Sequence, residues 1–193
     1  MAALYGGRHE GAALVIGYAP SVHAEVAAAR ALRPGAVLLG VKYAAVLYQE
    51  IEHVWTQHLE QAADIRARAN RAIFIHARRC GDQRRRIRRG RDADVDYVWP
   101  GLRWAAGGSG FAAALWARHG MGFEEVILCG CPLVPGGYAD EIRSFKTMYG
   151  PSFVAPHALH RWRAVIMGFI NDGRAAGITS MSGWTRSALG APA

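Results

Sequence analysis

Short runs of apolar residues alternate along this chain with longer segments whose apolar positions recur at helical spacing. Uninterrupted apolar runs are typical of strands that are covered on both faces, and a 3.6-residue period is typical of amphipathic helices. The runs predicted as strands are 12–17, 36–41, 53–58, 72–76, 126–129 and 178–181. The segments predicted as helices are 22–32, 44–50, 59–70, an alanine-rich stretch up to residue 119, 157–172 and a final turn from 182. Segment 97–100 fits either a short strand or an extended approach.

This alternation of strands and helices predicts an α/β fold: a Rossmann-like, mainly parallel sheet with helices on both faces. The length of 193 residues fits a single domain over 1–193. Two stretches interrupt the pattern. Residues 78–95 form an arginine-rich loop, and residues 134–155 are irregular and rich in Gly, Pro and aromatics. A connection as long as the second one is typical of a lid or binding loop.

Ligands of parallel sheets bind beyond the carboxyl ends of the strands, where the strand order reverses. We therefore expect the residues that follow the predicted strands to converge. These residues are Gly17, Pro20, Ser21, Lys42, His58, His76, Cys129–Leu133 (with Gly130) and Ser182. Ser21 is also placed to cap the helix 22–32.

A second turn, Gly108-Ser109-Gly110, opens the alanine-rich helix. Glycine permits positive φ and a close approach of the backbone, and a helix start presents unpaired N–H groups that suit an anion. It is neither the G-x-G-x-x-G dinucleotide fingerprint nor a P-loop. Close helix–sheet packing is the alternative interpretation of this turn, and an ordinary capped turn is the alternative for 17–21.

Basic charge is concentrated in one segment. Residues 78–91 hold eight arginines and one aspartate, so they carry +7 of the net charge of +8. Such a cluster can attract nucleic acid, phosphates or an acidic partner, and the alternative is a solvated loop. The residues predicted to form this anion or nucleic-acid patch are Arg84, Arg85, Arg86, Arg88 and Arg89.

The remaining composition narrows the class of protein. Three cysteines fit a reducing cytosol, and the Cys129-x-Cys131 spacing with a distant Cys80 is not that of a zinc site, so we expect structural thiols and no metal. Apolar runs are too short to span a bilayer, and the first residues lack the pattern of a signal peptide. We expect a cytoplasmic protein that requires no cofactor.

Several short motifs together resemble a known superfamily. The motifs that carry the resemblance are a first strand followed by Gly17-Tyr18-Ala19-Pro20-Ser21, a late Gly-Ser-Gly helix, and the run Val126-Ile127-Leu128-Cys129-Gly130-Cys131-Pro132-Leu133. The chain resembles Rossmann-like proteins that include bacterial sialyltransferases using a cytidine-monophosphate sugar, archaeal 6-hydroxymethylpterin diphosphokinase-like proteins, and small proteins of tailed phages and prophages. The closing segment Ser180–Arg186 is most similar to the phage group.

The resemblance implies a nucleotide or nucleotide-sugar pocket, with a cytidine nucleotide as the suspected ligand and a glycosyltransferase-type reaction. In the sialyltransferases a histidine before the penultimate helix acts as the base, and His157 stands at the matching position. Lys42 replaces the asparagine that they have after the second strand. The alternative is a non-enzymatic phage protein, associated with the virion or bound to DNA or a partner through the arginines. Whether the chain is an enzyme stays open, as does its assembly into a homo-oligomer or virion.

Overall fold

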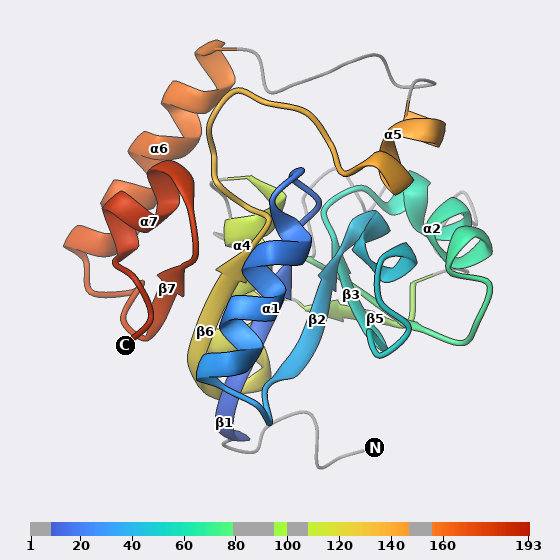
Figure 1. Cartoon of the computed structure of the whole chain (residues 1–193), viewed down its shortest axis with the longest axis horizontal. Coiled ribbons are helices and arrows are strands. Elements are labelled where there is room, and N and C mark those ends of the chain that lie inside the picture. The colour runs from blue at the N-terminus through green and yellow to red at the C-terminus, as the bar shows by residue number, and fades with distance from the viewer. Residues whose placement is uncertain (1–8, 79–94, 100–107, 147–155) are drawn as a thin grey trace.

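Seven strands form one sheet in which every neighbouring pair is parallel. The structure is a computed structural model that describes residues 9–78, 95–99, 108–146 and 156–193. The strands are β1 (His9–Ile16), β2 (Val37–Val41), β3 (His53–Thr56), β4 (Phe74–Arg78), β5 (Tyr97–Trp99), β6 (Phe123–Cys129) and β7 (Ile178–Ser180). Their order across the sheet is β5-β4-β3-β2-β1-β6-β7 (Figure 1). The predicted parallel α/β class is confirmed.

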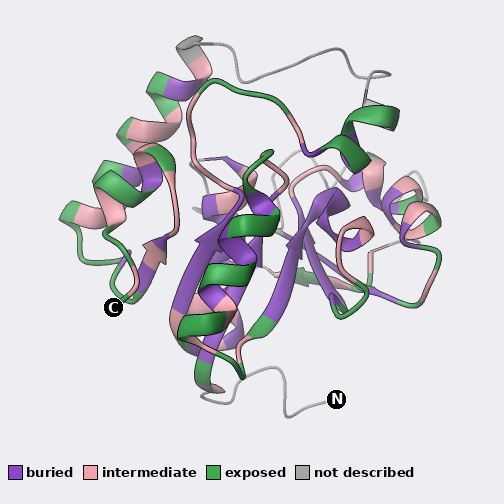
Figure 2. Cartoon of the chain, viewed as in Figure 1, coloured by how far each residue is buried: buried purple, intermediate pink, exposed green. Residues whose placement is uncertain are grey.

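Helices cover both faces of this sheet. They are α1 (Val22–Leu32), η2 (Lys42–Val46), η3 (Leu59–Gln61), α2 (Ala62–Ala69), α4 (Ser109–Leu115), the π-helix η5 (Trp116–Met121), α5 (Asp140–Lys146), α6 (Pro156–Asn171) and α7 (Gly183–Leu189). Helices α1, η2, α2 and α5 contribute to the core on one face. Helices α4, η5, α6 and α7 pack on the other, so the central strands are buried while helices such as α1 have one exposed side (Figure 2).

Strand β1 shows why the apolar runs lack a polar face. Leu14 and Ile16 belong to the core under α1, whereas Ala13 and Val15 belong to the core under α4. Successive side chains of a strand point to opposite faces, so a strand with helices on both sides needs an apolar residue at every position.

The strand order places a topological switch point at β1. The chain adds β2 to β5 on one side of β1 and then returns to add β6 and β7 on the other side. β1 pairs with β2 over Ala13–Ile16 and with β6 as far as Ile16–Cys129. From β1 the chain goes on to β2 and from β6 to β7, on opposite sides of the sheet, and a crevice is typical at such a point.

Helix α1 occupies the predicted range, and several other elements differ from prediction; β1 and β6, for example, each begin three residues earlier than expected. The expected helix 44–50 is the shorter 3₁₀ helix η2, and β4 lies two residues later than expected because its pairing with β3 begins at Phe74. The irregular segment 134–155 contains α5, which docks through the buried residues Ala139 and Ile142. Within the described residues, no helix is both long and apolar enough to cross a membrane.

Candidate functional site

A cavity of about 930 Å³ lies at the carboxyl edge of the sheet, over the switch point. It is lined by the turns that follow β1, β2, β3, β6 and β7 and by the start of α4. Ten of the residues that the sequence predicted at the site line it, namely Gly17, Pro20, Ser21, Lys42, His58, Gly108, Ser109, Gly110, Gly130 and Ser182, whereas Cys129 and His76, which were also expected to converge there, do not. The two serine-bearing turns, which are far apart in sequence, thus meet in one cavity.

Tight packing holds three of these turns together around Cys131. A Cβ at Gly17 would lie 2.5 Å from Cys131 Sγ, and a Cβ at Gly110 would lie 2.6 Å from it. A Cβ at Gly17 would also overlap the carbonyl oxygen of Gly130. Glycine is therefore required at both positions by space. The turns pack closely and also line the cavity, and their binding of an anion stays a prediction.

The carboxylate of Glu25 links three of the turns that line the cavity by hydrogen bonds. Its carboxylate is only 7 % exposed and lies on α1, one turn into the helix. Glu25 Oε1 accepts hydrogen bonds from the hydroxyls of Ser21 and of Ser182, the latter at 2.5 Å, and Oε2 accepts one from the Gly130 N–H at 2.8 Å. Ser21 stands at the N-cap position but makes no side-chain capping bond, contrary to expectation, because its hydroxyl points to Glu25.

Backbone strain is concentrated at the cavity. Three non-glycine residues of the described chain have positive φ: Lys42 at +50°, Asn70 at +50° and Leu133 at +48°. Asn70 ends helix α2, where asparagine is common in this conformation. Lys42 and Leu133 both line the cavity. The left-handed conformation costs a residue with a Cβ about 1–2 kcal/mol, and such strain is typical of functional sites.

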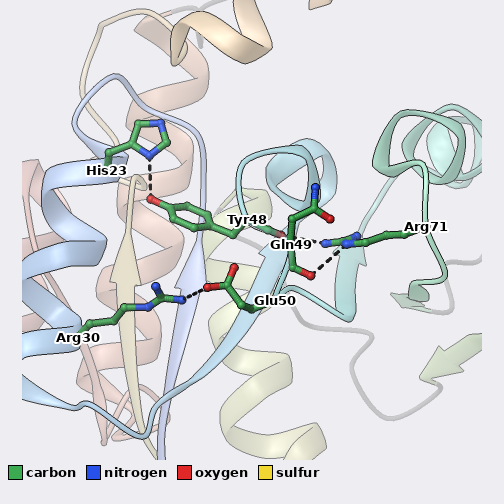
Figure 3. A network of polar contacts seen from close by, with 6 residues as sticks. All are labelled: His23, Arg30, Tyr48, Gln49, Glu50 and Arg71. Carbon is green, nitrogen blue, oxygen red and sulfur yellow. Dashed lines mark hydrogen bonds and ion pairs between the residues drawn. The ribbon is translucent and has the colours of Figure 1, made fainter.

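Arg71 fixes the segment that begins with Lys42. Its guanidinium donates to four main-chain oxygens within and after η2, at 2.7–3.2 Å. These oxygens belong to Ala45, Tyr48, Gln49 and Ile51. On the other side, the Tyr48 hydroxyl bonds to His23 Nδ1 at 2.9 Å, and Arg30 bonds to Glu50 at 2.9 Å (Figure 3). The segment is thus held between α1 and the end of α2.

Aromatic side chains form another part of the wall, and sequence reasoning missed them. Trp162 on α6 lies so close to Gly108, at φ +91°, that a Cβ there would come within 3.1 Å of its indole ring. The rings of Tyr18 and Tyr138 lie 5.4 Å apart, and burial raises the pKa of Tyr18 above its usual value, so its hydroxyl is neutral. The position of Trp162 within an apolar helical pattern indicated only a core residue.

The charged side chain that lines the cavity is basic, whereas the carboxylate of Glu25 lies behind the wall at Ser21, Ser182 and Gly130. Among the described residues that line it, Lys42 is the one with a permanent charge, and none is acidic. His58 lies beside it, with Nδ1 3.1 Å from Glu60 Oε1. Burial, and then the nearby Glu25, raise the pKa of Cys131 to about 12, so this thiol is neutral and unreactive. Over the described residues, no group of three His, Cys, Asp or Glu side chains is placed to hold a metal.

His76 does not reach the cavity, which corrects the prediction. It lies in the middle of β4 rather than at its end, and it is fully buried. Trp99 Nε1–H donates to His76 Nδ1 at 3.2 Å, so His76 Nε2–H must donate to His53 Nδ1 at 3.0 Å. Burial, and then His53, lower the pKa of His76 to about 3. This histidine is a neutral core residue.

Two further predictions fall outside what the structure describes. His157 belongs to the first turn of α6, as expected, but its side chain is outside the described residues. The arginine-rich patch, comprising Arg84, Arg85, Arg86, Arg88 and Arg89, lies in the range 79–94, which is also outside them. The hypotheses of a histidine base and of a nucleic-acid or partner contact stay predictions.

Comparison with protein-family models, with curated proteins and with solved structures found no match. The resemblance to the sialyltransferase-like superfamily therefore stays a prediction. The fold and the cavity define the class of protein: a Rossmann-like parallel α/β domain with a cavity at its switch point. Its function has to be argued from that cavity.

Proposed function

We propose that this protein binds a nucleotide or a nucleotide sugar in the cavity at the switch point. The observation that carries the proposal is the convergence of five strand-end turns on one cavity whose only permanently charged lining residue, within the described chain, is Lys42. The volume of about 930 Å³ lies in the range that small-molecule ligands occupy.

The lining supplies the contacts that such a ligand needs. Lys42 attracts a phosphate, and hydroxyl donors such as Ser109 can orient its oxygens. Trp162 and Tyr18 offer ring surfaces for a base. The backbone strain at Lys42 supports the same reading, because a lysine is kept there although glycine or asparagine would fit the conformation with less strain.

The reaction that we propose is transfer of the sugar from its nucleotide to an acceptor hydroxyl. His157 would take the proton of that hydroxyl while the glycosidic bond to the phosphate breaks and the nucleotide leaves. His157→Ala should then abolish turnover of a CMP sugar and leave nucleotide binding within about twofold of wild type. Loss of binding together with turnover would contradict this role.

A thermal-shift panel of nucleotides and sugar nucleotides tests the binding proposal. A ligand at 100 times its Kd stabilises the folded state by about 2.7 kcal/mol, or roughly 5–10 °C for a domain of this size. Lys42→Met should remove most of the shift. The matched control is Arg174→Met, because Arg174 is an exposed cation paired with Asp172 and does not line the cavity. The proposal fails if no compound of the panel shifts the melting temperature of the wild type.

A further inference from the structure

The cavity has two chemically different ends. It extends across the carboxyl ends of β3, β2, β1, β6 and β7, which are neighbours in that order. From β2, which Lys42 follows, to β6, two inter-strand spacings amount to roughly 10 Å. Lys42, His58 and Gln61 come from the β2 and β3 side, whereas Trp162 and Ile166 come from α6 on the other side (Figure 1).

The α6 end is apolar and aromatic. Trp162 lines the cavity and packs against Gly108, and the neighbouring lining residues Phe111 and Ile166 are buried. Among the polar lining residues at this end, Thr185 already has partners. Thr185 Oγ1 donates to the Cys131 carbonyl at 2.9 Å. Arg163, next to Trp162 in sequence, donates to the Leu133 carbonyl at 2.9 Å and is not among the described lining residues.

The β2–β3 end is polar and positively charged. Lys42 follows β2 directly and begins η2, in which the Ala45 carbonyl accepts a hydrogen bond from Arg71. His58 and Gln61 flank η3 and line the same end. Gln61 Oε1 is buried and has no hydrogen-bond partner in the described part of the chain. Such an atom costs free energy that a hydrogen bond from a ligand hydroxyl would recover.

We propose that the cavity binds its ligand in one orientation, with a planar ring on Trp162 and the anionic group beside Lys42. This inference rests on the proposed function, and it adds that the base of the nucleotide contacts Trp162 while its phosphate contacts Lys42. The ring gains stacking at the apolar end, where no charge competes for it. The phosphate gains the one permanent positive charge of the described lining at the other end.

The two ends can be tested separately with fragments of one nucleotide. CMP carries both groups, cytidine lacks the phosphate, and ribose 5-phosphate lacks the base. Each is titrated into wild type, Trp162→Leu and Lys42→Met, and the affinity is measured by NMR. Trp162→Leu should weaken CMP and cytidine about tenfold and leave ribose 5-phosphate within twofold. Lys42→Met should weaken CMP and ribose 5-phosphate by a similar factor and leave cytidine unchanged.

Two further variants separate stacking from folding. Trp162→Phe keeps an aromatic ring, so it should restore most of the cytidine affinity that Trp162→Leu loses. Trp184→Leu is the matched control, because Trp184 packs against the same core but is not among the described lining residues, and it should leave all three affinities unchanged. A failure of Trp162→Phe to bind cytidine better than Trp162→Leu would overturn the stacking role.

The outcomes distinguish this inference from the function on which it rests. If the wild type binds CMP but each variant weakens both fragments equally, or the pattern is reversed, the orientation is wrong and nucleotide binding stands. If the wild type binds none of the three compounds, nucleotide binding fails, and the orientation fails with it.

Discussion

Replacing Glu25 by alanine tests how the cavity is held together. The substitution removes the carboxylate on which the hydroxyls of Ser21 and Ser182 and the Gly130 N–H converge. These three donors come from the turns after β1, β7 and β6. Glu25 is buried, whereas the Ser21 and Ser182 hydroxyls also line the cavity, so the Gly130 N–H is the donor that loses most.

The cost can be worked out from these bonds. The Gly130 N–H is buried, and leaving such a donor unpaired costs about 1–3 kcal/mol. The two serine hydroxyls can rotate, so each loses about 1 kcal/mol, and removal of the buried charge recovers part of its desolvation cost. Glu25→Ala should therefore destabilise the fold by about 3 kcal/mol. Glu25→Gln keeps one oxygen for the Gly130 N–H and should cost about half as much.

Urea unfolding of both variants measures these differences, with Glu52→Ala as the control. Glu52 is exposed, so its loss should change the free energy of unfolding by no more than about 0.5 kcal/mol. Two results would refute the reasoning: a Glu25→Ala protein as stable as the control, or a Glu25→Gln protein as unstable as Glu25→Ala.

Three other predictions concern stability. The pKa of His76 is lowered to about 3, so His76 stays neutral in the fold while the unfolded chain takes up a proton below about pH 6.5. The free energy of unfolding should therefore fall by about 1.4 kcal/mol per pH unit from pH 6.5 downward. Unchanged urea midpoints between pH 7 and 5 would contradict this prediction. Gly110→Ala should lower the free energy of unfolding, measured in urea, by about 1–3 kcal/mol. Adding Cys131→Ala to the same chain should recover more than half of that loss. If the two losses simply add, the contact between residue 110 and Cys131 is excluded as the cause. Arg71→Met should lower the free energy of unfolding by about 2 kcal/mol. Arg71→Lys should not restore this loss, because a lysine cannot reach four carbonyls at once. Full rescue by lysine would count against the role of these four hydrogen bonds.

The position of the site was predictable because it follows from topology. Parallel strands end at one edge, so turns that follow apolar runs meet there whatever their distance along the chain. That rule brought Ser21 and Ser182 into one cavity although α1 to β7 separate them. It failed for His76, because the expected strand was two residues out of register, and pairing with β3 determines the register.

Other features of the site depend on packing that a single sequence does not encode locally. Glu25 stands three residues after Val22 and four before Ala29, so helical spacing places it on the buried face of α1, but only the fold brings Gly130 to its carboxylate. Trp162 lies in an apolar pattern that indicates a core helix, and its contact with Gly108 comes from α6 packing beside α4. The positive φ of Lys42 has no signal in the sequence, because lysine is not a residue that favours it.

The most direct test of the central claim is a ¹⁵N–¹H NMR titration of the wild-type protein with CMP. Binding at the switch point predicts that amide signals of the strand-end turns 17–21 and 130–133 and of 108–110 move in a saturable way. Signals from 33–36 and 174–177, which precede β2 and β7 at the opposite edge of the sheet, should stay in place. Shifts confined to that opposite edge, or no saturable shift at all, would contradict a nucleotide site in this cavity.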